Sequence, residues 1–296
     1  MKFLALLFCL FPALAQAKTN VVTTITDLAT IAREVGGDQV NVDSIAKGTQ
    51  DPHFIEAKPS YMVKLSKADL LIAVGLELEV GWVPSLIQGA RNPKVKSGEK
   101  GFLEIGPEIE PLEVPSGKIS RADGDVHPDG NPHFYLDPIR LGKTAQLIAA
   151  RLGELDPAHA AEFTKRGNAF NDRMKSKTEA WRKRIEKTGV KKIVTYHKTL
   201  TYFFDRFGIA NPAFLEPKPG IPPTSGHIIE VINLMKTQKV PLVLVENFFD
   251  VSVTKKVTDA VPGSRAASIA VDVEGEPGIK TNDDLIEQIV KAIEGK

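Results

Sequence analysis

The architecture of this 296-residue chain is set by residues 156–187, DPAHAAEFTKRGNAFNDRMKSKTEAWRKRIEK. Pro157 stands at an early helical position, apolar residues recur at helical spacing from Phe163 to Trp181, and charged residues fill the other face. About 30 residues at 1.5 Å each extend roughly 45 Å, which is longer than an ordinary domain helix. We therefore expect one long helix that joins two lobes. A long surface helix of a single domain is the alternative.

Strands and helices alternate on both sides of this segment. Before it, we expect strands at 21–25, 40–45 and 70–75 with helices at 27–35, 58–68 and 139–155. After it, we expect strands at 192–196 and 240–245 with helices at 199–207, from about 227 to 235, and at 285–293. Such alternation predicts an α/β fold with parallel sheets in each lobe. The expected boundaries are 18–155 for the N-terminal lobe, 156–187 for the linker helix and 188–296 for the C-terminal lobe.

The first 17 residues have the pattern of a secretory signal peptide. Lys2 precedes the apolar run 3–14, and Ala15-Gln16-Ala17 is an A-x-A cleavage site. Cys9, the only cysteine, lies inside the apolar run rather than after it, which is not where a lipoprotein cysteine stands. We therefore expect an exported protein that is periplasmic, soluble and not lipidated.

The composition excludes several classes of protein. Lys and Arg number 38 against 37 Asp and Glu, so bulk charge offers no basis for binding nucleic acid or an anionic membrane. Hydrophobic residues are 42% and charged residues 25%, as in globular proteins and unlike disordered tails. After the leader, no apolar stretch reaches the ~18 residues of a membrane helix.

Three of the six histidines follow expected strands or stand directly after proline. His53 and His133 each follow a proline, which restrains the backbone, and His197 ends the strand from Lys192. Ligand sites of open α/β sheets lie beyond the carboxyl ends of strands, so these imidazoles suggest one metal site. A closed zinc site needs a fourth ligand. Asp272 and Glu246 both end apolar runs, and the pattern alone leaves the choice between them open.

The other histidines fit ordinary surface positions. His127 lies in the Gly- and Asp-rich segment 116–131, with Asp123, Asp125 and Asp129, which we interpret as a solvated acidic loop. A weak secondary site that collects metal is the alternative for this loop. His159 and His227 stand near helix starts, and we do not expect them at the primary site.

Four stretches together resemble those of the zinc/manganese ABC-transporter solute-binding proteins, the cluster 9 or A-I metal receptors. They are DPHFIE at 51–56, NPHFYLDP at 131–138, VTYHKTLTYF at 194–203 and EPKPGIPP at 216–223. The resemblance extends along essentially the whole mature chain. The motifs are specific in this order, although each one alone is weak. The resemblance implies two Rossmann-like lobes, a rigid linker helix and one metal in the cleft between the lobes.

The resemblance also implies the ligands, the cargo and the partners. His53, His133 and His197 match the family's first three ligand positions, and Asp272 matches the aspartate of its late loop, although residues 273–278 depart from the commoner pattern. Manganese-type members carry a carboxylate at the third position, so His197 implies Zn²⁺ as the cargo. The expected protein is a monomer without enzymatic activity that delivers zinc to the permease subunit of an ABC importer. Loading by a periplasmic metallochaperone is left open.

Three alternatives accompany this interpretation. A periplasmic zinc hydrolase would use three protein ligands plus water, with Glu56 or Glu246 as general base. A manganese receptor of the same family would share the fold. An adhesin is a third alternative, which the expected lack of a lipid anchor disfavours.

Overall fold

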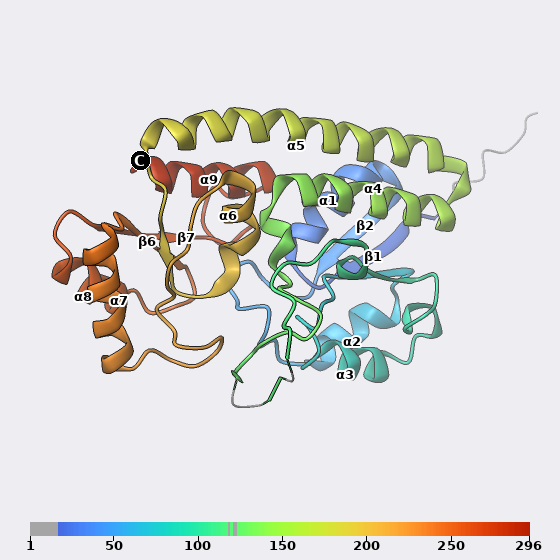
Figure 1. The fold of residues 1–296 in the computed structure, drawn as a ribbon. Coiled ribbons are helices and arrows are strands. Elements are labelled where there is room, and N and C mark those ends of the chain that lie inside the picture. The colour runs from blue at the N-terminus through green and yellow to red at the C-terminus, as the bar shows by residue number, and fades with distance from the viewer. Residues whose placement is uncertain (1–16, 118, 121–122) are drawn as a thin grey trace, which may run out of the picture.

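Two α/β lobes lie beneath one long helix in the computed structural model, which describes residues 17–117, 119–120 and 123–296 (Figure 1). The predicted signal peptide, including Cys9, falls outside the described residues except for Ala17. Helix α5 (Ala160–Thr188) runs along the top of both lobes. The predicted α/β architecture of two lobes with parallel sheets is confirmed, whereas the exact lobe boundaries stay a prediction.

The first lobe is built on a four-stranded sheet in the order β2-β1-β3-β4, with every strand pair parallel. Its strands are β1 (Thr19–Thr23), β2 (Val40–Ser44), β3 (Leu70–Ala73) and β4 (Phe102–Glu104). Its helices are α1 (Thr26–Gly36), α2 (Pro59–Ser66), α3 (Val83–Ala90) and α4 (Pro138–Leu155). The β1 and β3 strands are almost wholly buried, as the apolar, β-branched runs predict.

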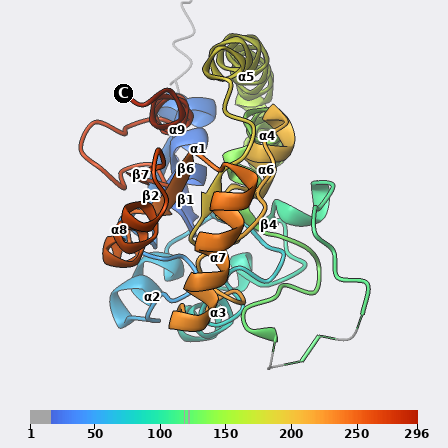
Figure 2. The same cartoon turned by 60° about the vertical axis from the view of Figure 1, so that its left-hand side comes forward.

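The second lobe repeats the plan with a three-stranded parallel sheet in the order β5-β6-β7. Its strands are β5 (Val194–Thr195), β6 (Leu242–Glu246) and β7 (Arg265–Ile269). Its helices are α6 (Thr201–Phe207), α7 (Ser225–Gln238), α8 (Val251–Ala260) and α9 (Asn282–Glu294). Seen from the side, α5 and α9 lie along the edge opposite α3 (Figure 2).

Helix α5 contributes to one hydrophobic core that continues through both lobes. Its buried apolar residues are Phe163, Phe170, Met174, Trp181 and Ile185, a stripe at helical spacing. Two glycines let α4 and α5 approach closely. A Cβ on Gly142 would come within 2.5 Å of the Asn171 side chain, and one on Gly167 within 2.9 Å of Ala149. The long helix therefore packs against both lobes rather than spanning free solvent.

Polar contacts also fix the first lobe to the second near the cleft. Asp137, fully buried at the start of α4, accepts two hydrogen bonds of 2.9 Å from Arg206 of α6. The Tyr202 hydroxyl donates to the Asn131 carbonyl at 2.6 Å. These contacts hold the segment that carries His133 against the second lobe.

Some elements differ from the sequence-based expectations. The sequence pattern does not predict helices α3 and α8 or strands β4 and β7. Helix α3 contains Pro84 and Gly89, α8 is rich in β-branched residues, β4 has three residues, and β7 has the sequence RAASI with one β-branched residue. A short 3₁₀ turn, Pro157–His159, precedes α5, which therefore begins later than expected. Across the described part of the chain, no helix combines the length and apolar character that crossing a bilayer requires.

Candidate metal centre

The loop after β2 presents His53. Asp51 accepts a hydrogen bond from the His53 backbone N–H at 3.0 Å, and its same oxygen lies 2.7 Å from His53 Nδ1. The Trp82 indole donates to the Pro52 carbonyl at 2.9 Å, which ties this loop to the body of the first lobe. The Asp-Pro-His order therefore fixes both the backbone and the ring of His53.

His133 opens a 3₁₀ turn, His133–Leu136, directly before α4. Its backbone N–H donates to the Asn131 side chain at 2.9 Å, and its Nδ1 lies 2.9 Å from the Tyr135 hydroxyl. The residue is 2% exposed, and its Nε2 is buried without a hydrogen-bond partner among the described residues. A buried nitrogen with a free lone pair is costly unless something binds it, so this atom fits a metal ligand.

The second lobe supplies His197, immediately after β5 and Tyr196. The Glu216 carboxylate contacts His197 Nδ1, and its other oxygen accepts the Gly220 N–H at 3.1 Å. Thr195 donates to the His197 carbonyl at 2.7 Å. His197 and Glu216 are both buried, so the ring has a single supported orientation.

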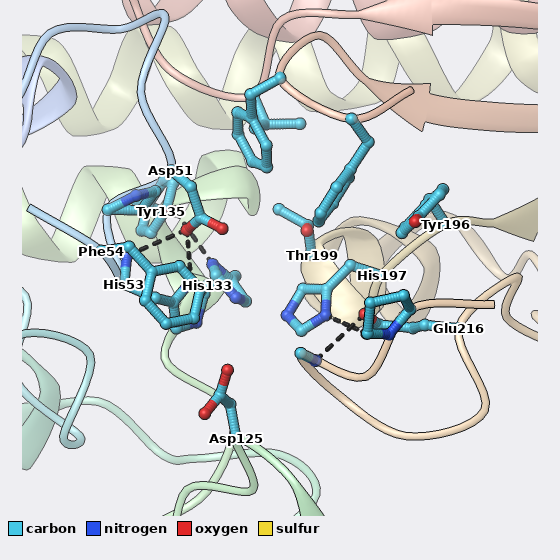
Figure 3. Close-up of a pocket in the computed structure, with 16 residues that line it drawn as sticks. Asp51, His53, Phe54, Asp125, His133, Tyr135, Tyr196, His197, Thr199 and Glu216 are labelled. Atoms are coloured by element: carbon cyan, nitrogen blue, oxygen red, sulfur yellow. Dashed lines mark hydrogen bonds and ion pairs between the residues drawn. The ribbon is translucent and has the colours of Figure 1, made fainter. Parts of the chain in front are cut away.

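These three imidazoles converge across the cleft between the lobes (Figure 3). One nitrogen from each lies within 4.8 Å of the others, and the ring centroids are 5.1 to 5.5 Å apart. Because each Nδ1 already has a partner, Nε2 is the nitrogen left for a metal. Zinc held at 2.0–2.1 Å needs nitrogens about 3.3 Å apart, which small side-chain rotations would provide.

The surroundings shift the pKa values of His133 and His197 in opposite directions. Burial, then the nearby His53 and His197, lower the pKa of His133 well below its ordinary value. Burial also opposes charge on His197, but the hydrogen bond and negative charge of Glu216 outweigh it and raise its pKa. Neutral imidazole is the form that binds metal.

The cavity at the cluster is small, about 200 Å³. Its walls include the three histidines, Asp51 and Glu216, with aromatic rings from Phe54, Tyr196, Phe248 and Phe249. This volume suits an ion with a few waters better than an organic substrate, for which pockets of ≈ 300–1,000 Å³ are usual.

The structure places Asp272 and Glu246 outside the three-histidine group. Asp272 is buried beside Asp27 of α1, where burial and the neighbouring negative charge raise its pKa well above the ordinary value. Neither Asp272 oxygen has a hydrogen-bond partner among the described groups apart from this facing carboxyl, so the pair is best satisfied by a shared proton. Glu246 accepts a hydrogen bond from Thr199 at 2.7 Å.

The acidic loop reaches the three-histidine group, a placement that the local sequence pattern does not predict. His127 Nε2 lies 3.3 Å from His53 Nε2, and Asp125 lines the metal cavity. The Asp125 N–H donates to the Pro219 carbonyl at 2.9 Å, which attaches the loop to the second lobe. Burial, then the charges of His53 and His197, lower the pKa of His127 to about 3. The expectation that this loop is simply solvated is therefore wrong for His127 and Asp125.

The two remaining histidines are engaged elsewhere. His159 Nδ1 lies 2.6 Å from Asp156 at the start of the long helix. His227 Nε2 lies 3.0 Å from the Phe214 carbonyl. Neither belongs to the three-histidine group among the described residues.

Comparisons with known proteins place this geometry in a family. The zinc-binding lipoprotein AdcA of Streptococcus pneumoniae (strain ATCC BAA-255 / R6) is 24% identical over 263 residues, which are 88% of this chain and 50% of AdcA, so the chain spans about half of that relative. The manganese ABC transporter substrate-binding lipoprotein scaA of Streptococcus gordonii is 27% identical over 294 residues, covering 94% and 91%. A crystal structure of ZnuA has the same fold, with a TM-score of 0.79, 19% identity and coverage of 94% and 98%.

The family model that matches is described as "Zinc-uptake complex component A periplasmic" and covers residues 21–295. Its match spans both lobes and includes His53, His133 and His197. The chain therefore belongs to the zinc-uptake complex component A family, the substrate-binding proteins of metal ABC transporters.

Proposed function

We propose that this protein is the periplasmic zinc receptor of an ABC importer, which captures Zn²⁺ and delivers it to the membrane permease. The observation that carries the proposal is the convergence of three buried imidazoles, each held through Nδ1, from both lobes. Proteins of this family are components of uptake complexes, so the hydrolase alternative is set aside. We further propose that it works as a monomer without a lipid anchor, although relatives such as AdcA are named lipoproteins.

Zinc is favoured over manganese by the donor atoms. Imidazole nitrogens suit zinc, copper, nickel and iron, whereas manganese prefers carboxylate, carbonyl and water oxygens. Zinc also exceeds manganese in the general order of affinity for a given site. The manganese receptor remains the second candidate, because relatives in this family include proteins named for manganese.

A metal competition experiment on residues 18–296 tests the proposal. The protein is stripped with chelator, offered zinc and manganese together, desalted, and its metals are counted by mass spectrometry. We expect one zinc per chain and no manganese. Equal or preferred manganese would assign the protein to the manganese receptors, and no bound metal would refute the receptor function.

We propose Asp272 as the fourth ligand, with His127 as the competing candidate because of its 3.3 Å approach to His53. Binding would require Asp272 to release the proton it shares with Asp27 and turn toward the imidazoles. We expect Asp272→Asn to weaken zinc binding by more than the roughly 10- to 100-fold that loss of a supporting residue costs, and Glu246→Gln and His127→Ala to weaken it less. Competition with a chelating dye measures each affinity, with His159→Ala as the control. A larger loss in His127→Ala would transfer the fourth position to that residue.

Zinc affinity should decrease as the pH is lowered, because His197 becomes protonated. Its pKa is raised by Glu216, so protonation begins to compete with zinc above the ordinary histidine pKa of about 6.5. Proton and metal bind the same nitrogen, so affinity is highest above this pKa and declines as pH falls through it. We expect about a tenfold loss per pH unit for each ligand that protonates.

Glu216→Gln is the matched variant for the pH series. It removes the charge that raises the pKa of His197, so the decline should begin at lower pH. Titrations between about pH 8 and pH 5.5 would measure both curves. An affinity for the unmodified protein that does not change over this range would contradict the prediction.

A further inference from the structure

A second cavity, of about 870 Å³, lies in the first lobe between helix α3 and the carboxyl ends of β3 and β4. None of its lining residues also lines the cavity at the three histidines. Figures 1 and 2 both place α3 on the side of the lobe opposite α5. This volume falls in the range of pockets that hold small organic molecules, and the carboxyl edge of a parallel sheet is where such ligands bind.

One face of α3 forms a long wall of the cavity. Val83, Ile87 and Arg91 recur at intervals of four residues, so they lie along one side of the helix over about 12 Å. Ile87 is half-buried there. The other walls are mainly apolar and are contributed by Ala73, Leu76, Phe102 and Pro107.

The turn that closes one end of the cavity is strained. Gly75, Leu76 and Glu77 have consecutive positive φ angles of 79°, 51° and 63°, which non-glycine residues rarely adopt. The buried Glu79 carboxylate holds this turn by accepting the Val74 and Gly75 N–H groups at 2.8 and 3.0 Å. Backbone strain that the surroundings enforce in this way is concentrated at ligand sites.

Charges of opposite sign stand at the two ends of the cavity. Glu77 precedes α3 and Glu104 ends β4, whereas Arg91 follows the last residue of α3 and Lys96 comes five residues later. None of these four side chains forms a hydrogen bond or ion pair with another residue in the described part of the chain. Glu104 lies close to the turn that carries Glu77, since its Cβ would be 3.4 Å from a Cβ on Gly75, whereas Arg91 and Lys96 follow the far end of α3. Asp129 is a further carboxylate in the lining.

We propose that this cavity binds a small zwitterion with an apolar spacer, its ammonium group at Glu77 and Glu104 and its carboxylate at Arg91 and Lys96. A short apolar peptide or a long ω-amino acid has this chemistry. The apolar walls accommodate the spacer, and the unpaired charges at each end fix its direction. The inference goes beyond the proposed zinc receptor and shares no lining residue with its metal site.

Calorimetric titration of the zinc-loaded protein with 8-aminooctanoate, octylamine and octanoate tests the proposal. The three probes share one spacer and differ only in their charged ends. We expect saturable binding of 8-aminooctanoate, roughly fivefold tighter than either singly charged probe. Equal affinity for all three, or no saturable binding of 8-aminooctanoate at millimolar concentration, would overturn the proposal.

Substitutions in the cavity test whether 8-aminooctanoate binds there. Ile87→Trp fills the cavity and should abolish binding, whereas Val63→Trp, on the exposed face of α2, should leave it unchanged. Arg91→Gln demands no repacking and should reduce the affinity for 8-aminooctanoate, and Arg91→Gln combined with Lys96→Gln should reduce it to that for octylamine. Zinc stoichiometry measured on each variant checks the fold independently. Undiminished binding in Ile87→Trp, with zinc retained, would place the ligand elsewhere and refute the assignment.

Discussion

Replacement of His197 by alanine is expected to abolish tight zinc binding. His197 is the only imidazole that the second lobe contributes to the three-histidine group, so its loss leaves both remaining members on the first lobe. Removing a supporting residue of a metal ligand already costs 10- to 100-fold in affinity, and removing the ligand itself should cost more. The buried Glu216 would also lose the imidazole that it contacts.

Thermal unfolding with and without zinc gives a direct measurement of this loss. A ligand at 100 times its Kd stabilises the folded state by ≈ 2.7 kcal/mol, so the zinc-dependent rise in Tm should disappear in His197→Ala. His227→Ala is the matched control, because His227 binds the Phe214 carbonyl instead. A variant without His197 that keeps one zinc and the full Tm shift would show that the ligand assignment is wrong.

The three histidines could be predicted because local sequence determines their positions. Pro52 and Pro132 restrain the backbone before His53 and His133, and a buried strand ends just before His197. The alternation of strands and helices likewise determines the two-lobe plan, since parallel strands bring their carboxyl ends to one edge. The choice of Asp272 over Glu246 as the fourth ligand came from the family resemblance, because the sequence pattern alone left it open.

The features that the sequence does not predict depend on contacts between residues far apart in the chain. His127 lies at the centre because the Asp125 N–H binds the Pro219 carbonyl, almost 100 residues later, and no local pattern encodes that contact. Asp272 faces Asp27, from the other lobe, for the same reason. The short elements α3 and β4 are stabilised by burial within the lobe rather than by strong local propensity, so periodicity could not identify them.

Replacement of Asp137 by alanine is expected to cause the largest loss of stability among single changes near the cleft, about 3 kcal/mol. Asp137 is fully buried, accepts the Ile139 N–H at the start of α4, and binds Arg140 at 2.6 Å and Arg206 at 2.9 Å. Loss of a helix cap costs ~1 kcal/mol, and hydrogen bonds to charged groups contribute ≈ 1.5–3 kcal/mol. Urea denaturation of the metal-free protein measures the free energy of unfolding.

The Asp137→Asn variant distinguishes the contribution of helix capping from that of the negative charge. Asparagine still caps a helix, so this variant should lose only the interaction with Arg140 and Arg206, and its destabilisation should be the smaller of the two. Asp172→Ala, which removes an exposed carboxylate 3.9 Å from Lys175, should change stability by less than about 0.5 kcal/mol.

The same substitutions should also affect zinc binding. Arg206 belongs to the second lobe and Asp137 closely follows His133, so loss of the Asp137–Arg206 contact should loosen the position of His133. Weaker zinc binding in Asp137→Ala than in Asp137→Asn is therefore expected, and equal stability of all three variants would mean that the lobes are held together without this carboxylate.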